Sequence, residues 1–210
     1  MSVKRTKWSV VVLGRWNPAI FTPAGVRSRC FKLDENTPIE VMVALDDFGP
    51  SKVRHEGLVV WADQQRFAVE LEDCDFPRLI KAMTIAAGVL ESLPETPVSA
   101  AGINVRYEVP AGEDRLTALL SAPVDNTFSD AGYEINGRHL GRVLSVPGIG
   151  RANIVLNAPP DGNWEVLLNY ELKSKTNITL KNWLSEVGVE VEKHTRALLA
   201  TVPGFTEEEV

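Results

Sequence analysis

The side chains of this 210-residue chain that could carry out acid–base or metal chemistry are spread along its length. The three histidines, His55, His139 and His194, stand far apart and form no HxH, HxxxH or HExxH motif. Metal sites bring several His, Cys, Asp or Glu ligands together, often at short and regular spacings. We therefore predict neither a metal site nor a cofactor, and we interpret each histidine as a surface or hydrogen-bonded side chain.

The motifs of nucleophilic and phosphate chemistry are also incomplete. Ser145 lies in the run Leu-Ser-Val-Pro, outside the GxSxG turn of hydrolases, and the glycines between 137 and 150 lack the Gly-Lys-Ser/Thr ending of a phosphate loop. The acidic groups Asp46-Asp47 and Glu72-Asp73-Asp75 could exchange protons near neutral pH only if they were buried together. Since they follow predicted strands, we interpret them as solvated turn residues and favour a noncatalytic protein.

The least ordinary segment runs from Trp16 to Pro23. It combines Trp16, Asn17 and Phe21 with two prolines, which makes a stiff loop that loses little conformational entropy on binding. The same aromatic side chains could instead be buried in the protein's own core. Both interpretations stay open, and Trp16 is the residue to test.

A second candidate surface is the polar side of the predicted strand Val98–Val109. There the apolar residues alternate with Asn104, Arg106 and Glu108, so that an amide, a guanidinium and a carboxylate follow one another. Water is the usual partner of such a face. The alternative function is a ligand-binding or enzymatic domain with a pocket between the sheet and the C-terminal helix, approached by Asn104, Arg106 and Tyr170.

The charge balance disfavours a nucleic-acid partner. The chain has 22 basic and 28 acidic side chains, a formal charge of −6. Arg15, Arg27, Arg29 and Lys32 gather in the first segment, and a local basic face of this kind can bind phosphates. We rank nucleic-acid binding last of three functions, because such arginines usually project into water from the surface of a sheet.

Proline and glycine divide the first half into short elements. The predicted strands are Trp8–Leu13, Val26–Leu33 with Cys30 inside it, Ile39–Leu45, and a hairpin of Leu58–Trp61 and Phe67–Leu71. A helix should follow the hairpin, with Asp75 as its N-cap, Pro77 in its first turn and Pro94 after its end.

The second half repeats this plan with little residue identity. We predict that its last helix is the longest element, capped by Asn177 or Thr179, with close packing or a bend at Gly188 and an end at Pro203-Gly204. The elements before it are the strand Val98–Val109, a short helix Glu113–Leu120, a polar loop Pro123–Asp130, and the strands Arg138–Val146, Asn153–Asn157 and Trp164–Leu172.

These elements predict an α+β fold of two similar units, 1–94 and 95–210. Each is a mainly antiparallel sheet followed by an amphipathic helix, and the two pack together or form one bilobed domain. No apolar run reaches the ~20 residues that cross a bilayer, and no secretory signal is evident. Cys30 and Cys74 fit two reduced thiols in a cytoplasmic protein.

Three parts of the chain resemble a sporadically distributed family of uncharacterised bacterial proteins. They are Trp16–Gly25, Thr96–Tyr107 and the C-terminal amphipathic helix. The resemblance implies a bacterial or phage origin and a cytoplasmic address, and it implies no activity. The two repeated β-rich units, which lack a catalytic cluster, favour a noncatalytic interaction protein. Such a protein would be a self-associating subunit or an accessory protein of a larger complex, with a protein partner or a second copy bound at a sheet edge, the Trp16–Pro23 loop or an outer helix face.

Overall fold

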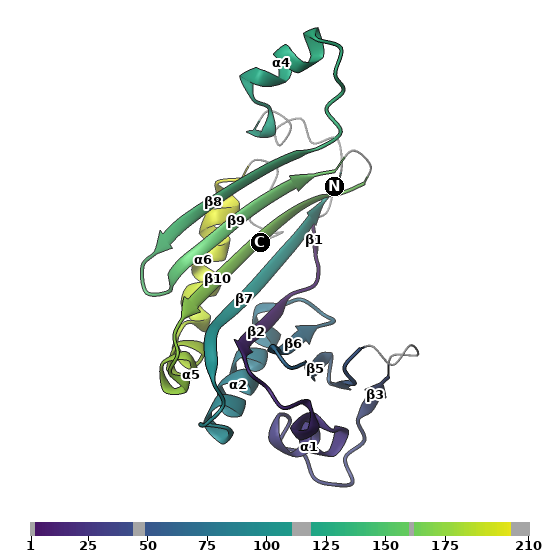
Figure 1. The fold of residues 1–210 in the computed structure, drawn as a ribbon, viewed down its shortest axis with the longest axis vertical. Helices are drawn as coiled ribbons and strands as arrows, with labels where there is room; N and C mark the ends of the chain where they lie inside the picture. Colours follow the sequence, from purple (N-terminus) through teal and green to yellow (C-terminus); the bar gives the residue numbers. More distant parts are fainter. Residues whose placement is uncertain (1–2, 44–48, 111–118, 160–161, 203–210) are drawn as a thin grey trace.

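The computed structural model describes residues 3–43, 49–110, 119–159 and 162–202 (Figure 1). The strands are β1 (Lys4–Arg5), β2 (Ser9–Gly14), β3 (Glu40–Met42), β4 (Lys52–His55), β5 (Leu58–Ala62), β6 (Arg66–Leu71), β7 (Val98–Val109), β8 (Arg138–Val146), β9 (Gly150–Ala158) and β10 (Trp164–Lys173). The helices are η1 (Pro18–Phe21), α1 (Pro23–Arg29), α2 (Phe76–Ser92), α4 (Pro123–Asp130), α5 (Asn177–Glu186) and α6 (Gly188–Ala200).

One antiparallel sheet contains all ten of these strands. Their order is β3-β4-β5-β6-β2-β7-β10-β9-β8, and β1 pairs with β7 beside this path. The predicted α+β class is confirmed. In the first half β2 pairs with β6, the last strand of the meander that follows it, and in the second half β7 pairs in the same way with β10. The ranges 1–94 and 95–210 share this sheet through the β2–β7 pair, whereas a repeat of structure stays a prediction.

Helices α2, α5 and α6 cover one face of the sheet (Figure 1). Most buried apolar side chains of both halves belong to one cluster beneath them, in which Trp8 packs on Phe76 and Tyr107, while Val59, Trp61 and Ala68 form a second, smaller cluster. Alternation explains why, since every second residue of β7 from Ile103 to Val109 is buried while the residues between are half-buried. None of the helices among the described residues is long and apolar enough to cross a membrane.

Local signals place α2 where the sequence predicts it. The Asp75 side chain accepts a hydrogen bond of 2.7 Å from the backbone N–H of Arg78, and Pro77 lies in the first turn, where its missing N–H costs nothing. The helix ends at Ser92, just before Pro94. Its buried side chains, among them Leu79 and Leu90, recur every three or four residues and face the sheet.

Two predicted segments are wrong. Val26–Leu33 is not a strand, because α1 begins at Pro23 with the Thr22 hydroxyl accepting from the N–H of Gly25, and Cys30 is its C-cap. The predicted polar loop Pro123–Asp130 is the helix α4, which starts at a proline and buries no side chain. The strand predicted over Ile39–Leu45 contains the shorter β3.

The predicted long C-terminal helix is two helices. It breaks at Val187, and α5 and α6 are both shorter than the 17-residue α2. A Cβ atom at Gly188 would lie 3.1 Å from Cγ1 of Ile80, so the close packing and the bend both occur. Thr176 occupies the N-cap of α5, in place of Asn177 or Thr179. The predicted helix 113–120 falls mostly outside the described residues, and the end at 203–204 falls wholly outside them.

Candidate binding surface

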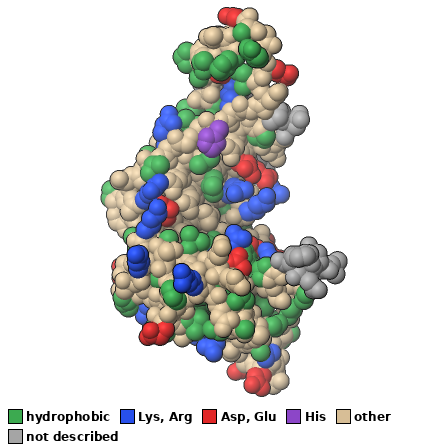
Figure 2. All heavy atoms as spheres, in the orientation of Figure 1, with side chains coloured by type: hydrophobic (Ala, Val, Ile, Leu, Met, Phe, Trp, Pro, Cys, Tyr) green, Lys and Arg blue, Asp and Glu red, His purple; other side chains and the backbone are tan. Residues whose placement is uncertain are grey.

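The face of the sheet turned away from α2, α5 and α6 carries the candidate site, and we call it the open face. Figure 2 shows this side of the molecule, with cationic, anionic and hydrophobic side chains mixed across it. On β7 it receives Asn104 and Arg106, two residues that the sequence analysis selected. The open face therefore includes the polar side predicted for this strand.

Four polar side chains cross the centre of the open face in a line. Ser9, Asn104, Asn169 and Asn153 stand directly opposite one another on β2, β7, β10 and β9. Nδ2 of Asn153 donates to Oδ1 of Asn169 at 2.9 Å, and Nδ2 of Asn169 donates to Oδ1 of Asn104 at 2.9 Å. Nδ2 of Asn104 then donates to the hydroxyl of Ser9 at 3.1 Å. We call this line the asparagine row.

The asparagine row leaves hydrogen-bonding capacity free. A carboxamide has two N–H donors and an oxygen with two lone pairs, and contacts within the row use about half of them. Oδ1 of Asn153 also accepts from Nε of Arg151 at 3.3 Å, and all four side chains of the row are half-buried and so partly open to solvent. Asparagine is depleted in strands, which makes three of them on neighbouring strands a costly choice for sheet stability alone.

A hollow of about 170 Å³ lies against the row. Gly102 and Ala100 line it, and a Cβ atom at position 102 would lie 3.3 Å from Nδ2 of Asn169. Glycine inside a central strand weakens it and often marks close approach by another molecule. The lining residues are Val11, Leu13, Ala100, Ala101, Gly102, Asn104, Asn169 and Glu171. Pockets for drug-sized molecules measure about 300–1,000 Å³, so this hollow has room for one side chain.

Ion pairs flank the row and the hollow. Nε of Arg151 lies 3.1 Å from Oε1 of Glu171, and Nζ of Lys173 lies 4.0 Å from the same oxygen. On the other side Nη1 of Arg106 lies 3.3 Å from Oε1 of Glu165. Nε of Arg106 is buried and has no hydrogen-bond partner among the described residues. The cationic side chains of these ion pairs are therefore close to balanced by the anionic ones, and the net electrostatic potential on this part of the open face neither favours nor disfavours an uncharged partner strongly.

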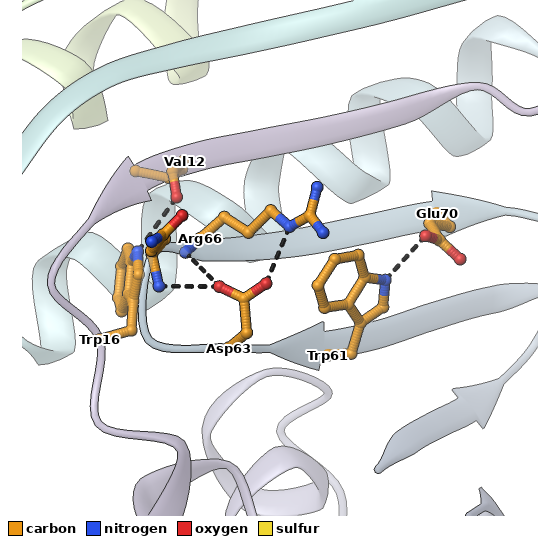
Figure 3. A network of polar contacts seen from close by, with 7 residues as sticks. Val12, Trp16, Trp61, Asp63, Arg66 and Glu70 are labelled. Carbon is orange, nitrogen blue, oxygen red and sulfur yellow. Dashed lines mark hydrogen bonds and ion pairs between the residues drawn. The ribbon is translucent and has the colours of Figure 1, made fainter. Parts of the chain in front are cut away.

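In the part of the sheet formed by β5 and β6, the Trp61 side chain is held against the open face by its neighbours (Figure 3). Its Nε1 donates to Oε1 of Glu70 at 2.8 Å, and the guanidinium of Arg66 lies 4.8 Å from its ring centroid. Asp63 accepts from Arg66 Nε at 2.9 Å. Burial would raise the pKa of Asp63, but the backbone N–H groups of Gln65 and Arg66, together with the Arg66 guanidinium, outweigh it and lower that pKa. These contacts hold the β5–β6 hairpin in place.

The structure places the Trp16–Pro23 aromatics inside the protein. Trp16 and Phe21 are each 5% exposed, and both rings contact Phe67 at centroid distances of 5.6 and 5.3 Å. Nε1 of Trp16 donates to the carbonyl of Val12 at 3.0 Å (Figure 3). Oδ1 of Asn17 accepts from the N–H of Ala19 and caps η1.

This segment nevertheless borders a second hollow, of about 400 Å³. It lies between η1 and the connection from α2 to β7. Its lining includes Arg15, Trp16, Asn17, Ile20, Phe21 and the residues from Ser92 to Pro97. The Trp16–Gly25 and Thr96–Tyr107 segments therefore both contribute to the lining of this hollow.

The remaining predicted residues lie elsewhere. Arg27 and Arg29, in the last turn of α1, line a third hollow of about 490 Å³ with Glu35. Tyr170 lies on the helix-covered face, where its hydroxyl is 2.9 Å from that of Thr195. Since Asn104 points to the open face, Tyr170 and Asn104 do not approach one pocket. The seven predicted site residues thus fall into three separate groups.

The groups singled out for chemistry stay dispersed. In the described ranges, no three His, Cys, Asp or Glu side chains gather where they could hold a metal ion. Asp75 is the cap of α2, and Asp46 and Asp47 lie outside the described residues. Burial raises the pKa of the Cys30 thiol to about 12 and also raises the pKa of Cys74, which keeps both thiols protonated at neutral pH.

The sequence analysis missed Ser9, Gly102, Asn153 and Asn169. A signal for two of them was present, because a hairpin with its turn near residues 158–163 places Asn153 opposite Asn169. Their alignment with Asn104 depends on the pairing of β7 with β10, which no local pattern specifies.

No protein-family model matches this chain, and no curated protein matches it either.

Proposed function

We propose that this protein is a noncatalytic interaction subunit that binds an extended segment of a protein partner on its open face. The asparagine row beside the side-chain-sized hollow carries the proposal. An extended segment offers side chains and peptide groups in alternation. One aliphatic side chain would enter the hollow, and the neighbouring peptide groups would exchange hydrogen bonds with Asn104 and Asn169.

The setting we propose is an accessory role in a bacterial or phage complex in the cytoplasm. The family resemblance of the Trp16–Gly25 and Thr96–Tyr107 segments supports this setting. The near balance of charge around the row supports a peptide partner over a polyanion, since phosphate binding needs uncompensated cations.

The expected affinity of the central contact follows from its size. Burying one aliphatic side chain contributes about 1.5–3 kcal/mol, and each new hydrogen bond contributes about 0.5–1.5 kcal/mol. Association itself costs several kcal/mol, so a short peptide should bind in the millimolar range, near −4 kcal/mol. A folded partner would reach higher affinity by covering more of the open face.

An NMR titration with blocked tripeptides tests the proposal at this affinity. Acetyl-Ala-Leu-Ala-amide should shift the backbone signal of Gly102 and the side-chain NH₂ signals of Asn104 and Asn169. Acetyl-Gly-Gly-Gly-amide, which has no anchor, should leave them in place. Ala100→Leu fills the hollow and should abolish the shifts, while Ala197→Leu makes the same change at an exposed position of α6 and should retain them. Equal shifts with both peptides, or with both variants, would contradict the proposal.

A second candidate function is small-molecule binding in the hollow beside Trp16. Its volume of about 400 Å³ falls within the range of ligand pockets, and Arg15, Asn17 and Glu95 offer polar groups at its rim. A thermal-shift screen of metabolites and nucleotides tests this candidate. A binder that shifts the NMR signals of Arg15 and Thr96, and leaves Gly102 unchanged, would favour it over the open face.

A further inference from the structure

The two edges of the sheet differ in how they are protected. The edge strand β3 has three residues, follows Pro38 and is tied by an ion pair from Glu40 to Arg54 of β4. The other edge strand, β8, has nine residues and no proline, and it pairs with β9 along its whole length without a register shift. Short strands, prolines and bulges are the usual devices that stop an edge from pairing with another chain. By these criteria β8 is unprotected.

The side chains of β8 do not block its free edge. Val143 is 62% exposed on the open face. Arg142 turns back on its own strand, since its Nη1 donates to the carbonyl of Gly141 at 2.8 Å. Arg138 is held by Asp125 of α4 at 3.0 Å. Among the described strands, β8 pairs with β9 alone.

We infer that two copies of this chain join through β8, pairing antiparallel about a two-fold axis at Val143 and so continuing the sheet from one copy into the other. Val143 lies opposite Asn153 at the end of the asparagine row, but this contact uses the outer edge of β8 and none of the residues that line the hollow, so each proposal can fail without the other.

Self-complementarity of the strand selects a second copy as the partner and Val143 as the centre. With the axis at Val143, the two Val143 side chains meet, Leu140 faces Val146, and Arg142 faces Leu144. Apolar groups then face apolar groups at the first two contacts, and no two charges are opposed. An axis at Arg142 would place one guanidinium against its copy, which is repulsive. An axis at Gly141 would set Val143 against His139.

The arm next to β8 supplies the additional area that a stable dimer needs. Stable interfaces bury about 1,200–2,000 Å², more than the pairing of two short edges provides. In α4 and the turn after it, Val124, Phe128 and Tyr133 are 48%, 46% and 69% exposed, and α4 buries no side chain. Figure 1 shows α4 projecting beyond the end of β8 where that strand begins. Antiparallel pairing brings α4 of one copy toward the Pro147–Gly150 turn of the other copy. The same two-fold axis therefore provides a partner for the edge of β8 and for the exposed side chains of α4.

Cysteine cross-linking tests the register directly. Directly opposite residues of an antiparallel pair have Cα atoms about 4.5–5.5 Å apart, which is within the range of a disulfide. Val143→Cys should therefore give a disulfide-linked dimer under mild oxidation, seen on a non-reducing gel. Val189→Cys, at a valine of α6 that is 70% exposed, should not. Cross-linking through Gly141→Cys in place of Val143→Cys would overturn the inferred axis.

Light scattering with charge variants tests the dimer itself. The unmodified chain should have twice its monomer mass, Val143→Lys should be monomeric because two ammonium groups would meet at the axis, and Val189→Lys should remain dimeric. Circular dichroism spectra should be equal for both variants, since both side chains are exposed and neither change should disturb the fold. A monomeric unmodified chain, or a Val143→Lys variant that stays dimeric, would overturn the inference.

Discussion

The hydrogen bond between Tyr170 and Thr195 fixes α6 to the sheet, and its removal gives a quantitative prediction. Both side chains are fully buried, and their oxygen atoms lie 2.9 Å apart. Thr195→Val keeps the shape of the side chain and removes the hydroxyl, so the Tyr170 hydroxyl loses its partner away from water. Leaving one buried polar group unsatisfied costs about 1–3 kcal/mol. The free energy of unfolding of Thr195→Val should fall by that amount.

Tyr170→Phe and the double variant complete a thermodynamic cycle. Tyr170→Phe should cost less than Thr195→Val, because a helical threonine can turn its hydroxyl to a carbonyl one turn earlier. Replacing both partners leaves no unsatisfied group, so the double variant should lose less stability than the two single variants together. We expect a coupling of about 0.5–3 kcal/mol.

Urea unfolding followed by tryptophan fluorescence measures these free energies. In thermal melts, about 1–3 kcal/mol corresponds to a drop of roughly 2–12 °C for a domain of this size. Thr84→Val is a matched control, because Thr84 also lies in a helix but is exposed and donates its hydroxyl to the carbonyl of Ile80 within that helix; this change should alter stability by less than about 0.5 kcal/mol. If the losses at Tyr170 and Thr195 were strictly additive, or if Thr195→Val matched Thr84→Val, the Tyr170 hydroxyl would not be bonded in the core.

Three further predictions concern single groups. Asp75→Ala removes the cap of α2 and should lower the free energy of unfolding by about 0.5–2 kcal/mol, measured by urea unfolding. Asp75→Asn, which can still accept the cap hydrogen bond, should retain most of this stability, and equal losses in the two variants would show that the cap hydrogen bond is unimportant. Because burial raises the pKa of Cys30 to about 12, the unfolded thiol ionises first, and stability should fall by about 1.4 kcal/mol per pH unit between pH ~8.5 and ~10, below the range where the buried tyrosines Tyr107 and Tyr170 contribute. This slope should be absent in Cys30→Ala melts over the same range, and its persistence there would assign it to other groups. The lowered pKa of Asp63 stabilises the folded protein above the unfolded pKa of about 3.9, and this stabilisation is lost as pH falls through the folded value. Asp63→Asn should therefore make the free energy of unfolding depend less on pH at acid pH. An unchanged dependence would contradict the pairing of Asp63 with Arg66.

Elements with strong local signals were predictable from the sequence. Strand β7 has a period of two from Ile103 to Val109, and its predicted bounds are those observed. Helix α2 combines an N-cap at Asp75 with a proline in its first turn and an apolar stripe, and each of these acts within a few residues. Both elements could be placed because no distant contact was needed to define them.

The wrong segments are those in which residue preference and end signals disagree. Val26, Cys30 and Phe31 favour strands, but the Thr22 cap followed by Pro23 starts a helix, and burial of Val26 in the core stabilises it. The sequence of Pro123–Asp130 resembles a polar loop because it lacks the row of apolar residues that a helix packed on a core would have. The helix α4 indeed buries no side chain. At Gly188 the apolar pattern continues through the break, and the close packing there against Ile80 of α2 is a long-range contact that the local pattern does not contain.

The candidate site was only partly predictable, because it depends on register. Asn104 could be assigned to the polar side of its strand from alternation alone. The asparagine row exists because β10 pairs with both β7 and β9 in registers that place Asn169 between Asn104 and Asn153. Those registers are set by long-range pairing across the sheet, which one sequence does not specify.

The two proposed contacts are compatible in one assembly, and their geometry determines its form. In an antiparallel pair, directly opposite residues project to the same face, so the two-fold axis at Val143 is perpendicular to the plane of the sheet. Both open faces of a dimer would then lie on the same side, each with its own asparagine row. A partner with two extended segments could bind both copies at once, and linking the two sites would strengthen millimolar contacts by a large factor without any new contact. Val143→Lys should therefore weaken binding of such a two-segment partner while leaving the affinity for a single blocked tripeptide unchanged. Equal weakening of both ligands would show instead that position 143 belongs to the peptide-binding surface.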